Sequence, residues 1–178
     1  RPALRPLPAT CSWMPKAHCS VCRRSAFCAS AQGRSKHVRS RALDRAWLTA
    51  HARAESIFMP DVTSSANARG LLQLLPSTAE TIAVRNAITW QGPESLYRPE
   101  VNIVLGAGAL RDVIDTYGGK AYLAIGAYNA GPTAVNRWLA ARGNLDADFW
   151  IETVPYKETR EYVRRIKILY RRYRSNEG

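Results

Sequence analysis

The sequence predicts a mainly α-helical fold with at most a small β-hairpin over residues 62–66. Apolar residues recur at three- and four-residue steps in several segments, which is the spacing of one helix face. Prolines and glycines divide these segments into lengths typical of short helices. No segment of comparable length alternates apolar and polar residues with the period of two that a half-buried strand requires.

The helices are expected to follow one another along residues 43–174. Pro60 is expected to end the first helix, and Ser77 with Glu80 forms a capping box that begins the second. Pro99 suits the first position of the third helix. The expected helices span residues 43–57, 77–87, 99–117, 120–129, 132–141 and 159–173.

The chain of 178 residues suits one domain with terminal segments. Residues 1–42 are predicted to be a disordered extension, because they combine prolines, scattered serine and arginine, and no apolar periodicity. Residues 43–174 would form the domain and residues 175–178 a C-terminal tail. The first forty residues hold eight basic residues and no acidic one, so most of the formal net charge of +12 belongs to the extension. A charge of this size suggests a polyanionic partner.

All four cysteines, Cys11, Cys19, Cys22 and Cys28, lie in the extension. One CxxC pair without a second pair disfavours a zinc site, and disulfides with any of three connectivities stay open. The sequence contains no run of about 18 apolar residues, so no transmembrane segment is predicted. No apolar run follows the basic start, so no export signal is visible.

Glu55 is the acidic residue whose local surroundings indicate a catalytic role. It lies near the C-terminal end of the first expected helix, among alanines, Ile57 and Phe58. The helix dipole does not favour an anion at that end. Surroundings of low polarity raise the pKa of a carboxyl group, which is the state that a general acid needs. A solvated glutamate at a helix end is the alternative interpretation.

Other segments contain polar side chains in unusual settings. Gln73 interrupts the apolar run 70–76, so it is either a structural bracket or a substrate contact. Tyr128 and Asn129 precede a turn among small residues, which suits either the floor of a groove or a packed helix corner. Residues 152–160 combine acidic and aromatic side chains around a proline, as sugar sites do and as ion-paired loop ends also do. The basic residues of the final helix are interpreted as its solvated face.

Taken together, residues 43–174 resemble the catalytic domain of the Slt-type soluble lytic transglycosylases, lysozyme-like enzymes that cut bacterial peptidoglycan. Four motifs of that family match in the same order. The first is the Glu-Ser-x-x-x-Pro element, which is similar to residues 54–60 here. The others resemble residues 64–79, residues 102–106 with 127–132, and residues 149–163.

The resemblance implies a lysozyme-like fold with Glu55 as the one catalytic acid and base. Glu55 would protonate the glycosidic oxygen between N-acetylmuramic acid and N-acetylglucosamine. It would then take the proton of the muramoyl 6-hydroxyl, which closes a 1,6-anhydro ring. The resemblance also implies a sugar groove, with Tyr128 close to Glu55, and neither a metal nor an organic cofactor. The groove residues it implies are Ser64, Leu72, Gln73, Ala127, Tyr128, Asn129 and Glu152.

A count of carboxylates agrees with this mechanism. Ordinary glycosidases need two carboxylates, whereas the segment around Glu55 offers only Asp61, six residues on and beyond a proline. The family supplies the idea that the substrate's acetamido group replaces the second carboxylate. One alternative is a hydrolysing muramidase that uses Asp61 or another acid. A second is a non-catalytic module that binds cell wall or nucleic acid, against which the intact Glu55, Gln73 and Tyr128 argue.

The sequence departs from the family pattern at three positions. Leu72 stands where methionine is common, which conserves volume and apolar character. Asn67 replaces a glycine, which is tolerable if that position needs a positive φ. His51 replaces an apolar residue on the helix that carries Glu55. The resemblance implies glycan strands of peptidoglycan as the partner, no nucleic acid, a monomer, and a location in the periplasm or cell envelope.

Overall fold

The computed structural model describes residues 43–143 and 145–175. The expectation of a disordered extension over residues 1–42, and the open alternatives for its cysteines, lie outside the described residues. Within the described ranges the protein forms seven α-helices and one 3-10 helix. Their bounds are α2 Arg45–Ser56, α3 Pro76–Arg85, η1 Pro93–Tyr97, α4 Pro99–Thr116, α5 Ala121–Ala130, α6 Pro132–Arg142, α7 Ala147–Thr153 and α8 Lys157–Ser175.

The prediction of a mainly α-helical fold is confirmed. In place of a hairpin, the described residues contain two isolated antiparallel bridges, Thr63 with Arg69 and Arg69 with Leu74. Pro99 is the first residue of α4, as predicted. The turn between α5 and α6 lies at Gly131, whose φ of 84° suits a residue without a side chain.

Two predicted helix ends are wrong. The capping box does not form, because α3 begins at Pro76 and Ser77 is already inside the helix, with Leu75 at the cap. Proline has a φ suited to the first helical position, so it starts this helix without a side-chain cap. The first helix, α2, ends at Ser56 and not next to Pro60, because Ile57 and Phe58 both adopt left-handed backbone conformations. The short elements η1 and α7 were not predicted.

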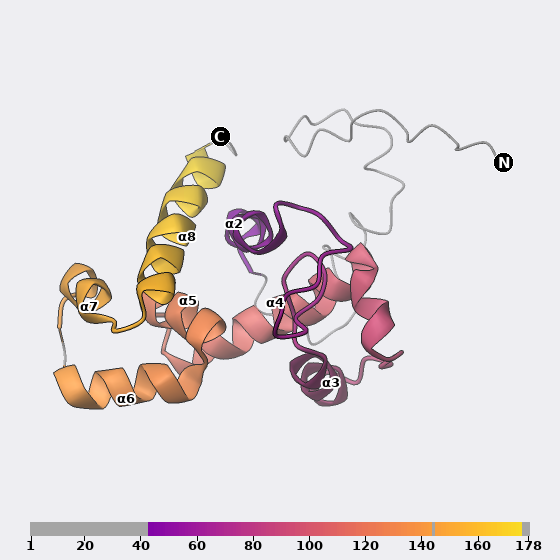
Figure 1. Ribbon diagram of the computed structural model, residues 1–178, viewed down its shortest axis with the longest axis horizontal. Helices are drawn as coiled ribbons and strands as arrows, with labels where there is room; N and C mark the ends of the chain where they lie inside the picture. Colours follow the sequence, from indigo (N-terminus) through magenta and orange to yellow (C-terminus); the bar gives the residue numbers. More distant parts are fainter. Residues whose placement is uncertain (1–42, 144, 176–178) are drawn as a thin grey trace, which may run out of the picture.

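The helices pack around α4 and α5, which form the centre of the domain. Figure 1 shows α4 crossing the middle, with α6, α7 and α8 on one side and α3 with the 57–75 loop on the other. The middle of α5 is buried from Leu123 to Ala127, between α4, α6 and α8. The helix α2 packs along α8. This last contact brings the C-terminal end of α2 against a buried face of α8.

The final helix is amphipathic, as its sequence pattern predicts. Its buried face consists of Thr159, Tyr162, Val163 and Ile166. Most of its arginines are exposed, which confirms the interpretation of a solvated face. Lys167 pairs with Asp148 of α7 at 2.6 Å. The charged side of α8 therefore faces solvent and α7, and its apolar side holds α2 and α5.

Candidate active site

Glu55 is the next-to-last residue of α2, and its carboxylate meets α8. Tyr162 donates a hydrogen bond from its hydroxyl to Oε1 of Glu55 at 2.5 Å. The glutamate is partly buried, so the solvated alternative does not hold. Burial raises the pKa of Glu55 to about 7, while the Tyr162 hydrogen bond and the charge of Arg165 act in the opposite direction and Glu158 adds to the rise. At neutral pH this carboxyl group can both give and take a proton.

Tyr128 lies near Glu55 but bonds elsewhere. Its hydroxyl donates to the backbone carbonyl of Leu72 at 2.8 Å. Burial, followed by the charge of Glu55, raises the pKa of the Tyr128 phenol well above its usual value. The hydroxyl that contacts the glutamate belongs to Tyr162, a residue that sequence reasoning did not place in the site. The only signals for Tyr162 were its place on the apolar stripe and inside the 149–163 motif.

The ring of His51 packs against the rings of Tyr128 and Tyr162. It lies one turn before Glu55 on α2 and is fully buried. Its ring centroid is 5.5 Å from that of Tyr128 and 6.2 Å from that of Tyr162. Burial lowers the pKa of His51 to about 4, so the imidazole is neutral. Its Nδ1 lies 2.9 Å from the carbonyl of Trp47, and because a carbonyl only accepts, this nitrogen carries the proton.

The 57–75 loop is held to α4 by one amide side chain. Asn102 donates from Nδ2 to the carbonyls of Arg69 and Leu96, and its Oδ1 accepts from the backbone N–H of Leu72. Gly70, with a φ of 75°, passes so close that a Cβ would lie 2.2 Å from the Leu96 carbonyl oxygen. Gly106 of α4 likewise leaves room for the side chain of Leu72. These contacts explain structurally why the loop and α4 carry Gly and Asn at these positions.

The amide of Gln73 acts as a structural bracket. Its Nε2 donates to the carbonyls of Val62 and Gly70, at 3.1 and 2.9 Å. The residue itself has a φ of 45°, a conformation that a non-glycine residue adopts only when its surroundings fix it. Asn67 has a φ of 63°, which meets the condition under which asparagine can replace a glycine here. The loop is therefore closed by its own hydrogen bonds.

The remaining predicted groove residues lie in different settings. Ser64 accepts from the backbone N–H of Ala68 within its own loop. Asn129, at the end of α5, accepts from the hydroxyl of Thr159 at 2.7 Å. Glu152 is exposed and pairs with Arg164 of α8.

Two predicted groove residues are buried. Leu72 has no exposed surface, and Ala127 is 2% exposed. They support the site from behind, Leu72 through the carbonyl that Tyr128 contacts. The structure thus brings Glu55, Tyr128 and Leu72 together, while the contacts of Ser64 and Glu152 do not involve Glu55.

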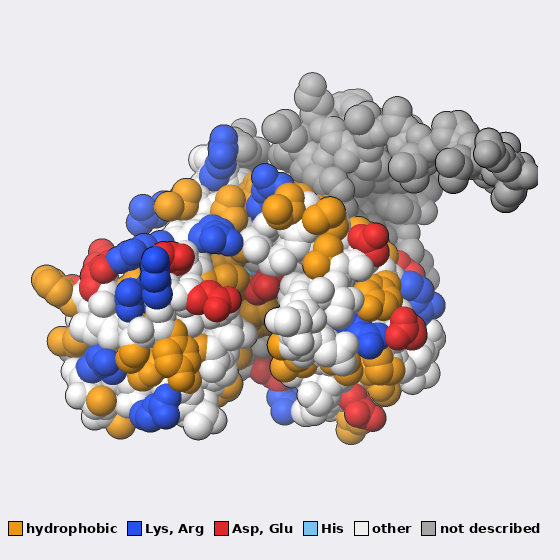
Figure 2. All heavy atoms as spheres, viewed as in Figure 1, with side chains coloured by type: hydrophobic (Ala, Val, Ile, Leu, Met, Phe, Trp, Pro, Cys, Tyr) orange, Lys and Arg blue, Asp and Glu red, His pale blue; other side chains and the backbone are white. Residues whose placement is uncertain are grey.

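Figure 2 shows a hollow between the side of the molecule formed by α6 and α8 and the side formed by the 57–75 loop and α3. Acidic side chains border it. Asp61, the second carboxylate near Glu55 in sequence, is exposed. Within residues 43–143 and 145–175 there is no group of three or more His, Cys, Asp or Glu side chains that could hold a metal ion. No helix in these ranges is long and apolar enough to cross a membrane.

Comparison with known proteins identifies the family of this chain. A family model described as the transglycosylase SLT domain matches residues 35–151. A putative soluble lytic murein transglycosylase of Haemophilus influenzae is 42% identical over 125 residues, which cover 70% of this chain and 21% of the relative.

Two solved structures share the fold. One is an inactive glutamate-to-glutamine mutant of the lytic transglycosylase Slt from Pseudomonas aeruginosa, with a TM-score of 0.75 and 37% identity over 84% of this chain and 24% of that one. The other is the 70-kDa soluble lytic transglycosylase of Escherichia coli, with a TM-score of 0.74 and 35% identity over 76% of this chain and 22% of that one.

The chain spans between a fifth and a quarter of the length of these relatives. The family model nevertheless covers more than half of the chain, including all of α2 with Glu55, the 57–75 loop and Tyr128 of α5. The chain therefore belongs to the transglycosylase SLT domain family.

Proposed function

We propose that this chain cleaves the β1,4 bond between N-acetylmuramic acid and N-acetylglucosamine in peptidoglycan and leaves a 1,6-anhydro end. The observation that carries the proposal is the partly buried Glu55, whose pKa is raised to about 7 and whose carboxylate is held by Tyr162. The names of the relatives support the substrate class. An inactive glutamate-to-glutamine mutant of one relative supports a role for an essential glutamate.

The reaction would begin with Glu55 in its protonated form. The acid gives its proton to the glycosidic oxygen, and the bond between that oxygen and C1 of the muramoyl residue breaks. The acetamido carbonyl of the same sugar stabilises the positive charge that develops at C1. This replaces the second carboxylate of ordinary glycosidases, which agrees with the exposure of Asp61.

Glu55 would then act as the base. Its carboxylate takes the proton of the muramoyl 6-hydroxyl, whose oxygen attacks C1 and closes the 1,6-anhydro ring. Glu55 ends protonated, ready for the next cycle, and no water is consumed. A pKa near the working pH suits a group that must serve in both forms, and the Tyr162 hydrogen bond favours the ionised form that the second step needs.

The glycan would lie against residues from three elements. Ser64 and Gln73 come from the 57–75 loop, Tyr128 and Asn129 from the end of α5, and Glu152 from α7. Glu152 would have to exchange its partner Arg164 for a sugar hydroxyl, or bind while it is paired. Leu72 and Ala127 would support this surface from behind. No metal or organic cofactor takes part in the proposal, and the chain would act as a monomer in the cell envelope.

Mass spectrometry of muropeptides released from purified peptidoglycan tests the proposal. The wild-type chain should release products with 1,6-anhydro ends, and Glu55→Gln should release none while it keeps its helical circular dichroism. Glu80→Gln, an exposed glutamate on α3, is the matched control and should be fully active. Reducing ends would instead indicate a hydrolysing muramidase. Binding to peptidoglycan without any release by the wild type would indicate a non-catalytic module.

A further inference from the structure

Arg69 is the point at which the 57–75 loop is tied together. Its backbone forms one bridge with Thr63 and another with Leu74, which closes both halves of the loop on one residue. Its backbone carbonyl also accepts from Asn102 of α4. Its side chain donates from Nε to Oδ1 of Asn67 at 3.0 Å.

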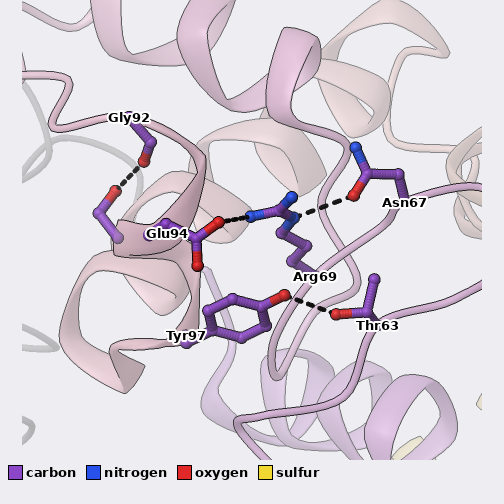
Figure 3. Close-up of polar contacts among 7 residues, drawn as sticks. Thr63, Asn67, Arg69, Gly92, Glu94 and Tyr97 are labelled. Atoms are coloured by element: carbon purple, nitrogen blue, oxygen red, sulfur yellow. Dashed lines mark hydrogen bonds and ion pairs between the residues drawn. The ribbon is translucent and has the colours of Figure 1, made fainter.

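The same side chain ties the loop to η1. The Nη1 of Arg69 lies 2.5 Å from Oε1 of Glu94. The guanidinium lies over the ring of Tyr97, 5.4 Å from its centroid. The hydroxyl of Tyr97 in turn lies 2.6 Å from Oγ1 of Thr63. Figure 3 shows Arg69 between Glu94 and Asn67, with Tyr97 and Thr63 on one side of it.

The burial of the two charged partners is unequal. The Arg69 side chain is only 15% exposed, whereas that of Glu94 is 80% exposed. An ion pair with a solvated carboxylate contributes little by itself. A guanidinium that is mostly buried, stacked on a ring and bonded to two side chains is fixed in one geometry. These contacts fix the conformation of the loop around Arg69.

The loop needs such a tie because parts of its backbone are strained. Asn67 and Gln73 both have a positive φ, which costs about 1 kcal/mol or more at a non-glycine residue. Such conformations persist only where surrounding contacts impose them. Asn67 is held directly by the side chain of Arg69, and Gln73 immediately precedes Leu74, the bridge partner of Arg69.

We propose that Arg69 is a positioning residue for glycan binding, which holds the Ser64 and Gln73 segments of the 57–75 loop in the shape of one groove wall. This inference rests on the proposed function, because it takes the groove as the place where the glycan lies. Arg69 acts through Asn67, Thr63 and Leu74 and does not touch the reacting atoms. Loss of its guanidinium should weaken glycan binding more than it slows bond cleavage.

Two matched substitutions test this role in the full chain. Arg69→Met keeps an unbranched aliphatic side chain at this position and removes the guanidinium, which lies over Tyr97. Arg85→Met is the control, because Arg85 likewise pairs with one carboxylate, that of Asp112 of α4, outside the 57–75 loop. KM and kcat are measured on purified glycan strands, and backbone amide exchange is followed at Ser64 and Gly70.

For Arg69→Met we expect KM to rise about five- to tenfold, with kcat within about twofold of the wild type. The Ser64 and Gly70 amides, which bond to Ala68 and Val62, should exchange faster than in the wild type. Arg85→Met should change neither property. Arg69→Lys should recover only part of the affinity, because an ammonium lacks the planar fork that contacts Asn67 and Glu94 together.

Equal KM values for Arg69→Met and Arg85→Met, or unchanged loop exchange, would overturn the inference. If Arg69→Met fails to fold, Arg69→Lys serves in its place and should raise KM by a smaller factor with kcat within about twofold of the wild type; an unchanged KM in that variant also overturns the inference. A wild-type chain that releases no product refutes the proposed function, whereas an active wild type with an insensitive Arg69 refutes only this inference.

Discussion

His51 and Glu55 lie one turn apart on α2, and burial shifts their pKa values in opposite directions. The pKa of Glu55 is raised to about 7 and that of His51 is lowered to about 4. Both groups are therefore held uncharged over much of the range between these values. An apolar environment penalises either charge, so one environment keeps the acid protonated and the histidine neutral.

Opposite shifts predict opposite effects of pH on stability. The folded-state pKa of Glu55 lies above its ordinary value of 4.5, so its contribution is fully present below pH 4.5 and is lost as the pH rises through 7. The folded-state pKa of His51 lies below 6.5, so its contribution is present above pH 6.5 and is lost as the pH falls through 4. Between pH 4.5 and 6.5 the two effects cancel.

Single variants should separate these two effects. His51→Leu leaves only the Glu55 effect. Between pH 4.5 and pH 6.5 its free energy of unfolding should therefore fall by about 2–3 kcal/mol more than that of the wild type. Glu55→Gln leaves only the His51 effect and should show the reverse. Urea unfolding of the three proteins at both pH values measures the difference. Parallel pH profiles in all three would contradict the opposed shifts.

The alkaline limb of the pH–rate profile should report the ionisation of Glu55. If the first step needs protonated Glu55, kcat/KM should fall as the pH rises through about 7. Arg165→Gln removes a cation that lowers this pKa, so the midpoint should move to higher pH; Glu158→Gln removes an anion that raises it, so the midpoint should move lower.

Both shifts should stay below about one pH unit, because the two side chains are exposed and solvent screens them. Arg171→Gln, an exposed arginine farther along α8, is the control for the change in net charge and should leave the midpoint in place. Shifts of the same sign in Arg165→Gln and Glu158→Gln would show that the limb does not belong to Glu55.

Removal of one hydroxyl should distinguish the two tyrosines. Tyr162→Phe keeps the ring beside His51 and deletes the hydrogen bond to Glu55, so the pKa of Glu55 should rise and kcat should fall about tenfold or more. Tyr128→Phe deletes only the bond to the Leu72 carbonyl and should cost about 1 kcal/mol of stability without moving the pH midpoint. A larger midpoint shift in Tyr128→Phe than in Tyr162→Phe would reverse these assignments.

Asn102 should be a major source of stability for the loop. Asn102→Ala leaves the buried N–H of Leu72 and the carbonyls of Arg69 and Leu96 without this partner, so we expect a loss of about 3–5 kcal/mol. Asn86→Ala is the control, because Asn86 is an exposed residue whose amide donates to the Ile82 carbonyl of its own helix, and it should cost about 1 kcal/mol or less. Chemical denaturation measures both, and equal losses would be inconsistent with the bridging role.

The sequence by itself determined the features that depend on neighbours along the chain. The 3.6-residue periodicity predicted the helices around Glu55 and along α8, and Pro99 predicted the start of α4. The apolar neighbours of Glu55 predicted the direction of its pKa shift. The two wrong helix ends arise where neighbouring residues offer different signals. Pro76 begins α3 in place of Ser77, and the left-handed turn at Ile57 ends α2 before Pro60. The elements η1 and α7 are too short to show a period.

Only the tertiary structure decided which groups meet. The partner of Glu55 is Tyr162, 107 residues away, and nothing in the local pattern separates that tyrosine from a core residue. Leu72 is buried where the family resemblance implied a groove contact, because Gly106 of α4 leaves the space for it. Arg69 gains its partners Glu94 and Tyr97 only when η1 folds against the loop. Contacts of this kind depend on the packing of helices distant in sequence, which periodicity and spacing do not encode.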